Sequence, residues 1–129
     1  MIFLKLFVAS SFVAVLWSLI QTIRHARRTQ TQPEAFAMHT RYANITLGLT
    51  VISIVLTRIM VIVHGGLNHT TLFAVHLPLA LLYAISFAVL KFKITGKKNP
   101  AVHRRVAYTC CLLSHLGAFS TGIPLLVWL

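Results

Sequence analysis

Four long apolar segments constrain the fold of this chain more than any other feature of its sequence. They are Leu6–Ile23, Ala43–Val63, Thr71–Leu90 and Val106–Leu129, and a helix needs about 20 predominantly apolar residues to cross a bilayer. Charged residues make up only 10% of the chain, too few to give it the polar surface of a soluble domain. These runs are also too long and too uniformly apolar for the strands of a membrane barrel. We therefore predict an all-α integral membrane protein, a four-helix antiparallel bundle in which residues 1–129 form a single transmembrane domain.

The basic residues are distributed unevenly and predict how the chain crosses the membrane. Of 12 Lys and Arg, only Lys5 and Arg58 lie outside the connections between segments 1 and 2 and between segments 3 and 4. Both connections lie on one side, and short loops rich in Lys and Arg stay in the cytoplasm. We expect a multi-pass protein of the bacterial cytoplasmic (inner) membrane, with both termini and the 65–70 loop outside. The basic side should attract anionic lipid. Segments this apolar leave no platform for nucleic acid, and no soluble substrate is evident.

Turn and cap residues predict where two helices begin and where one ends. Asn99 followed by Pro100 has the form of an N-cap with proline at the first helical position. Glu34, which also follows a proline, begins the second helix and places its acid at the positive end of the helix dipole. Gly65 and Gly66 end the second helix, because glycine permits left-handed backbone.

Helical periodicity gives each segment a small or polar face. At about 100° per residue, the residues within about 40° of His39 on the second segment are Thr46, Thr50, Ser53, Thr57 and His64. The other segments carry Ser11, Ser18 and His25; His76, Tyr83 and Phe87; and His103, Cys110, Ser114, Gly117 and Thr121. Such residues line ordinary contacts between membrane helices. Packing explains the hydroxyls well, but it explains less well a histidine at each end of one stripe. On the last segment, His115 falls about 120° from the face of His103.

Four histidines lie near segment ends, two at each predicted membrane face. His39 and His103 are at the cytoplasmic face, and His64 and His76 are at the outer face. Neutral imidazole is a common ligand of haem iron and copper, and axial haem ligation needs two imidazoles at similar depth on facing helices. We therefore expect each pair to form a cofactor-binding or metal-binding site for haem b or copper. The alternative is that these side chains pack or contact lipid headgroups.

The rest of the composition excludes several classes of cofactor. The sequence has no CxxCH motif, so covalent c-type haem is excluded. Glu34 is the only acidic residue, which excludes carboxylate-rich Mg, Ca and di-iron sites. Arg58 lies about 8 Å from the outer end of the second helix by helix rise, with no acid on that side. A haem propionate would pair with it, and we include Arg58 among the candidate binding residues; snorkelling to the headgroups is the alternative.

The layout of the histidines resembles the bacterial four-helix membrane family of CtaM-like proteins, a domain of unknown function. The resemblance covers roughly residues 20–129 and rests on these matching pieces: His39-Thr40-Arg41, His64, Ala74-Val75-His76, His103-Arg104-Arg105 and Thr121-Gly122. It implies a role in the maturation of haem–copper terminal oxidases. His115 and the adjacent Cys110 and Cys111 are departures from the family pattern.

The leading hypothesis is a membrane accessory protein that binds haem or copper through paired histidines and supports cytochrome oxidase assembly. Its partner would be an oxidase subunit or another membrane respiratory complex. A second hypothesis is a b-type electron carrier with two fixed haems, and a third is a cofactor-free small subunit of a respiratory complex. No nucleophile, base and orienting group occur together, so we do not expect an enzyme.

Overall fold

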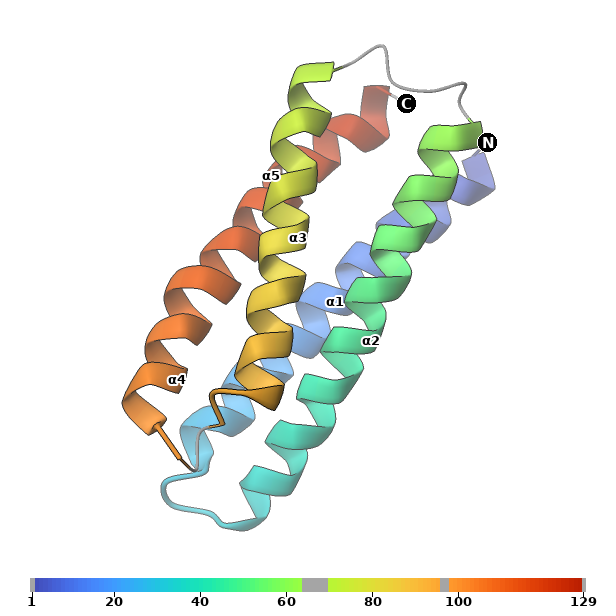
Figure 1. Cartoon of the computed structure of the whole chain (residues 1–129). Coiled ribbons are helices and arrows are strands. Elements are labelled where there is room, and N and C mark those ends of the chain that lie inside the picture. Colours follow the sequence, from blue (N-terminus) through green and yellow to red (C-terminus); the bar gives the residue numbers. More distant parts are fainter. Residues whose placement is uncertain (1, 64–69, 96–97, 129) are drawn as a thin grey trace. The chain divides into compact units, whose positions relative to one another are not determined.

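The chain is built from long helices. The computed structural model describes residues 2–63, 70–95 and 98–128. Its elements are α1 (Ile2–Arg28), α2 (Glu34–Val63), α3 (Thr70–Phe92), α4 (Pro100–Val106), the π-helical segment η1 (Ala107–Leu112) and α5 (Leu113–Trp128). The last three follow one another without a break and form one rod (Figure 1). Four helices of the described residues are long and apolar enough to cross a membrane, which confirms the predicted all-helical, four-helix membrane architecture.

Contacts between residues divide the chain into two units. The first is Met1–Thr57, with α1 and most of α2, and the second is Arg58–Leu129, with the end of α2, α3 and the α4–η1–α5 rod. Each unit has its own helix–helix contact.

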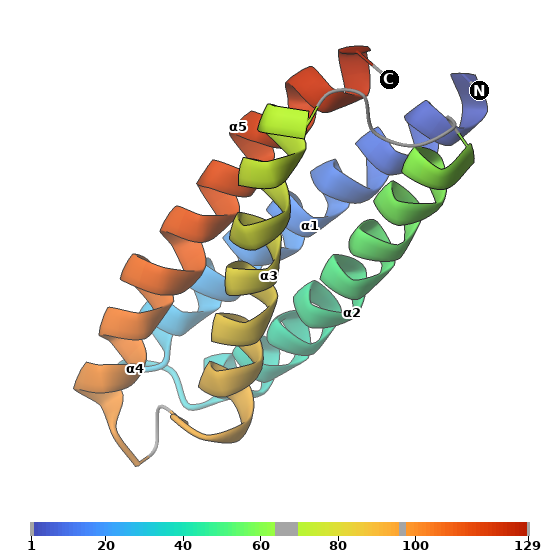
Figure 2. The same ribbon diagram turned by 45° about the horizontal axis from the view of Figure 1, so that its top comes forward.

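In the first unit, α1 and α2 pack as an antiparallel pair. Trp17 meets the edge of Tyr42 with 5.7 Å between ring centroids, and His25 stacks on the same ring at 5.3 Å. Residues late in α1 therefore contact residues early in α2. Figures 1 and 2 show the two helices side by side, joined at that end by the short link that follows Arg28.

The middle of the polar stripe predicted on α2 is buried, whereas His39 and Thr57 are half-buried. The exposed fractions of Thr46, Thr50 and Ser53 are 0%, 4% and 4%, and Ser18 of α1 is also fully buried. The hydroxyl of Thr46 lies 3.0 Å from that of Ser18 and 3.2 Å from that of Thr22. Hydroxyl pairs of this kind join membrane helices because lipid offers them no other partner. The apolar residues on other faces of α2 are exposed: Ile45, Val51, Ile52, Val55 and Ile59.

In the second unit, α3 packs against the rod in the opposite chain direction (Figure 2). His76 near the start of α3 meets Thr121 late in α5. Tyr83, two turns further along α3, meets His115 near the start of α5. His76, Tyr83 and Phe87 are all buried, which confirms the predicted inward face of α3. Between these contacts Gly117 permits a close approach, because a Cβ there would lie 3.0 Å from a methyl carbon of Leu79.

The predicted helix starts are confirmed, with one correction. α2 begins at Glu34, and α4 begins with Pro100 at its first position. Asn99 occupies the N-cap position, but its side chain makes no capping hydrogen bond; its carbonyl accepts from the backbone N–H of His103 over 2.9 Å. The backbone of Asn99 therefore begins the helix while its amide side chain plays no part. Gly65 and Gly66, predicted to end α2, lie outside the described residues.

The π-helical segment changes which residues of the rod face α3. A π-turn holds more residues than an α-turn, so a single helical wheel loses its phase across Ala107–Leu112. Both Ser114 and His115 are buried beyond it, and Cys111 is buried within it. The wheel that placed His115 about 120° from the inward face is therefore wrong. The Ser114 hydroxyl donates to the carbonyls of Cys110 and Cys111 at the end of the segment.

Candidate cofactor site

His39 is held by the backbone of the neighbouring helix. It lies in the second turn of α2, and its Nδ1 atom is 3.0 Å from the carbonyl oxygen of Thr22 on α1. A carbonyl can only accept, so Nδ1 carries the proton and donates it. In the neutral imidazole the lone pair is then at Nε2, the atom through which such a tautomer ligates a metal ion.

His103 is held in the same way within the second unit. Its Nδ1 atom donates to the carbonyl oxygen of Ile94 over 2.7 Å. Ile94 lies just beyond α3, and its own N–H bonds back to the carbonyl of Val89. The imidazole therefore ties the start of α4 to the connection from α3, and its lone pair is again at Nε2.

His76 is the most buried of the proposed ligands that the structure describes, with 5% of its surface exposed. Its Nδ1 atom lies 3.0 Å from the hydroxyl oxygen of Thr121. That hydroxyl donates its hydrogen to the carbonyl of Gly117 over 2.8 Å, so its oxygen is the acceptor for the imidazole. His76 thus joins α3 to α5 through the same ring nitrogen that His39 and His103 use.

His39 and His103 share one property that suits a metal ligand, donation from Nδ1 to a backbone carbonyl. Metal-binding histidines almost always donate the second ring nitrogen to a carbonyl or carboxylate, which fixes the tautomer and the ring orientation. The donor chemistry of His39 and His103 fits an axial ligand of haem or a ligand of copper in this respect. Because the acceptor in both cases is a backbone carbonyl, the orientation of the ring is independent of the side chain at the accepting position.

The structure leaves the proposed pairing as a prediction. His39 belongs to the first unit and His103 to the second, and His64, the predicted partner of His76, lies outside the described residues. Arg58 is exposed on α2. Among the described residues, no three His, Cys, Asp or Glu side chains are placed to hold a metal ion together.

His115 is the polar residue whose position the sequence did not predict. It is 6% exposed, packs on the ring of Tyr83 at 4.7 Å between centroids and lies near Phe119 at 6.3 Å. Its Nε2 atom is buried with no hydrogen-bond partner in the described part of the chain. The sequence does mark His115 as a site candidate, because it is an ionisable residue within a spanning segment, with packing as the alternative; what the sequence did not predict is that it faces α3.

Comparison with known proteins gives no match: no family model, no curated protein and no solved structure is significantly similar to this chain.

Proposed function

We propose that this chain is an accessory protein of the bacterial cytoplasmic membrane that binds haem or copper through its histidines and supports assembly of a haem–copper terminal oxidase. The observation that carries the binding proposal is the shared anchoring of His39 and His103. In each, Nδ1 donates to a backbone carbonyl, over 3.0 Å and 2.7 Å. This leaves the ring lone pair at Nε2 and holds the ring in one orientation.

The assembly role rests on the resemblance to CtaM-like proteins. The matching pieces surround the residues that carry the chemistry, namely His39, His76 and His103. An accessory protein that hands on its cofactor needs ligation weak enough to reverse. Two imidazoles without a carboxylate or a thiolate would suit such transient binding better than a closed site with more ligands.

Purification in mild detergent, followed by an optical spectrum and a metal assay, tests the proposal. We expect substoichiometric, exchangeable haem or copper, and loss of it in His39→Ala and His103→Ala. The matched control is His25→Ala, which removes a half-buried imidazole that stacks on Tyr42 in the first unit and should retain the cofactor. Stable stoichiometric haem with reversible reduction would contradict the assembly role and favour an electron carrier. Cofactor content that is unchanged in both variants would contradict histidine ligation.

The pairing has its own test. If His39 and His103 hold one cofactor, either replacement abolishes the same spectral feature and the double replacement adds little, because residues that act as a unit are not additive. His64→Ala should leave that feature largely intact, because we assign His64 to the outer pair with His76. Equal and additive losses from all four replacements in folded protein would contradict two separate sites.

A further inference from the structure

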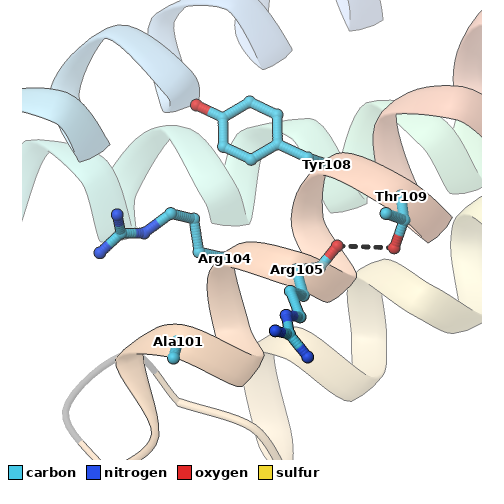
Figure 3. A pocket seen from close by; sticks show the side chains of 5 residues that line it. All are labelled: Ala101, Arg104, Arg105, Tyr108 and Thr109. Carbon is cyan, nitrogen blue, oxygen red and sulfur yellow. Dashed lines mark hydrogen bonds between the residues drawn. The ribbon is translucent and has the colours of Figure 1, made fainter.

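The surface of the rod carries two arginines around a hollow near its first turn. The lining residues are Ala101, Arg104, Arg105, Tyr108 and Thr109. Their spacing repeats every three to four residues, so they form a single face of α4 and η1. Figure 3 shows the side chains of Arg104 and Arg105 pointing in different directions, with Tyr108 one turn further along and on the side of Arg104.

These arginines have almost no acid in the chain to pair with. Glu34 is the only acidic residue among 129, against 12 Lys and Arg. One carboxylate cannot neutralise 12 cations, so most of these positive charges have no acidic side chain to pair with. Both arginines are exposed. Two exposed guanidinium groups on successive residues are available to an anion from outside the chain, and their forked donors match the oxygens of a phosphate.

The depth of Arg104 in the membrane span and the residues that follow it indicate which class of anion would bind there. Arg104 lies four residues into the span that begins at Pro100, or about 6 Å by helix rise. Tyr108 lies about 12 Å in and is 39% exposed, where a tyrosine ring suits the boundary between headgroups and hydrocarbon. Beyond it, Leu113 and Leu116 are 62% and 49% exposed and offer an apolar path for an acyl chain. From the membrane surface inward, a lipid would thus contact the arginines first, then the tyrosine ring and then apolar side chains.

We infer that Arg104, Arg105 and Tyr108 form a binding site for the phosphodiester headgroup of an anionic phospholipid. Rotation about their flexible side-chain bonds brings the two guanidinium groups to the phosphate oxygens, and the phenol donates from the hydrocarbon side. The hydroxyl of Thr109 already donates to the carbonyl of Arg105 over 2.6 Å (Figure 3). It therefore shapes the hollow without supplying a donor to the lipid. This site does not depend on the proposed cofactor.

Native mass spectrometry of the full chain in neutral detergent tests the site with phosphatidylglycerol against phosphatidylcholine. We expect preferential retention of phosphatidylglycerol and a loss of affinity of about tenfold in the double variant Arg104→Gln, Arg105→Gln, because each phosphate contact is charge-assisted. The matched control is Arg27→Gln, Arg28→Gln, which removes the same charge from exposed positions at the end of α1. Equal losses of affinity in the two double variants would mean that net charge alone causes the loss, and would contradict a specific site at Arg104 and Arg105.

Two further measurements keep the inference falsifiable. Arg104→Lys with Arg105→Lys retains the charge, so folding is preserved, yet it should lose about threefold in affinity because ammonium groups lack the bidentate fork. Unchanged affinity in this variant would overturn recognition by the guanidinium groups. Inorganic phosphate at millimolar concentration should not displace the lipid, since it lacks the acyl chain. Complete displacement would overturn the lipid assignment in favour of free phosphate.

Discussion

The imidazole of His115 lies against the ring of Tyr83, with 4.7 Å between ring centroids and 52° between ring planes. The contact joins α5 to α3 through aromatic surface, whereas Nε2 of the same imidazole is buried with no hydrogen-bond partner among the described residues. A buried polar atom without a partner costs about 1–3 kcal/mol. The contact therefore combines favourable packing of the two rings with unfavourable burial of the Nε2 atom.

Replacement of His115 by phenylalanine should raise the stability of the protein. The ring contact with Tyr83 is kept and the unpartnered nitrogen is removed, so we expect a gain of about 1 kcal/mol in the free energy of unfolding. Denaturation by sodium dodecyl sulfate in mixed micelles measures it. His76→Phe is the matched control and should lose about 1 kcal/mol, because it removes the bond to Thr121. A marked loss in His115→Phe would show that the imidazole has a polar partner or ligand in the membrane.

Replacement of Gly117 by leucine should destabilise the contact of α3 with α5. Even a Cβ at this position would lie 3.0 Å from Leu79, so a larger side chain should cost about 1–3 kcal/mol through overpacking. A Cβ at Gly48 would meet no heavy atom within 4 Å, and Gly48→Leu should be neutral or slightly stabilising. Addition of Leu79→Ala to the Gly117→Leu variant should restore part of the loss. Equal effects at both glycines would contradict the close approach.

Replacement of Thr46 by valine should weaken the pair of α1 and α2. The change keeps the shape of the side chain but removes the hydroxyl that contacts Ser18 and Thr22. Polar contacts between membrane helices contribute about 0.6 kcal/mol on average, so we expect a loss of about 0.5–1.5 kcal/mol in the unfolding free energy. Thr40→Val is the control, because the exposed hydroxyl of Thr40 bonds only within its own helix, to Phe36. A larger loss at Thr40 than at Thr46 would be inconsistent with this interface.

Replacement of Arg58 by leucine distinguishes the two cofactors proposed for the outer site. Haem carries propionates with which an arginine can pair, whereas a bare cuprous ion has no anionic group for the arginine. We expect haem retention to fall severalfold, consistent with the loss of a charge-assisted bond, and copper retention to stay unchanged. Absorbance and metal analysis of one preparation give both readings. Unchanged haem retention would remove Arg58 from the site.

Single cysteines in the basic connections should react only from the cytoplasmic side. Thr31→Cys and Asn99→Cys place the label at exposed positions of the two connections, in a chain whose native Cys110 and Cys111 have been replaced. Short basic loops remain in the cytoplasm, so a membrane-impermeant reagent should label neither site in intact cells. Labelling from outside would reverse the orientation and place both termini in the cytoplasm.

Most of the fold was predictable because a bilayer allows so few solutions. Length and apolar composition were enough for the four helices, and the stripe through Thr46, Thr50 and Ser53 correctly indicated the inward face of α2. The helical-wheel prediction of which residues face inward is wrong where the helix departs from 3.6 residues per turn. No residue in the segment Ala107–Leu112 is diagnostic of a π-turn, so helical periodicity could not show that His115 faces α3.

The candidate site was predictable only in its residue types. Histidines near helix ends are visible in a sequence, but the partners that orient His39 and His103 are the carbonyls of Thr22 and Ile94. Every residue has a carbonyl, so no pattern of side chains marks these two. The hollow beside Arg104 and Arg105 was also missed, since basic loop residues are expected in a membrane protein for reasons of orientation alone.

Because of the π-helical segment, the number of residues in the rod does not by itself determine the directions in which its two ends face. Loss of one residue from Ala107–Leu112 that relaxed the segment into an ordinary helix would leave α4 and α5 facing nearly the same directions as before, because a π-turn holds about one residue more than an α-turn. The arginines of α4 and the α3-facing residues of α5 can thus keep their directions when a relative lacks one residue in this segment. Alignments of relatives should be read with a gap allowed at this point, since a gapless alignment would equate positions that face different surroundings.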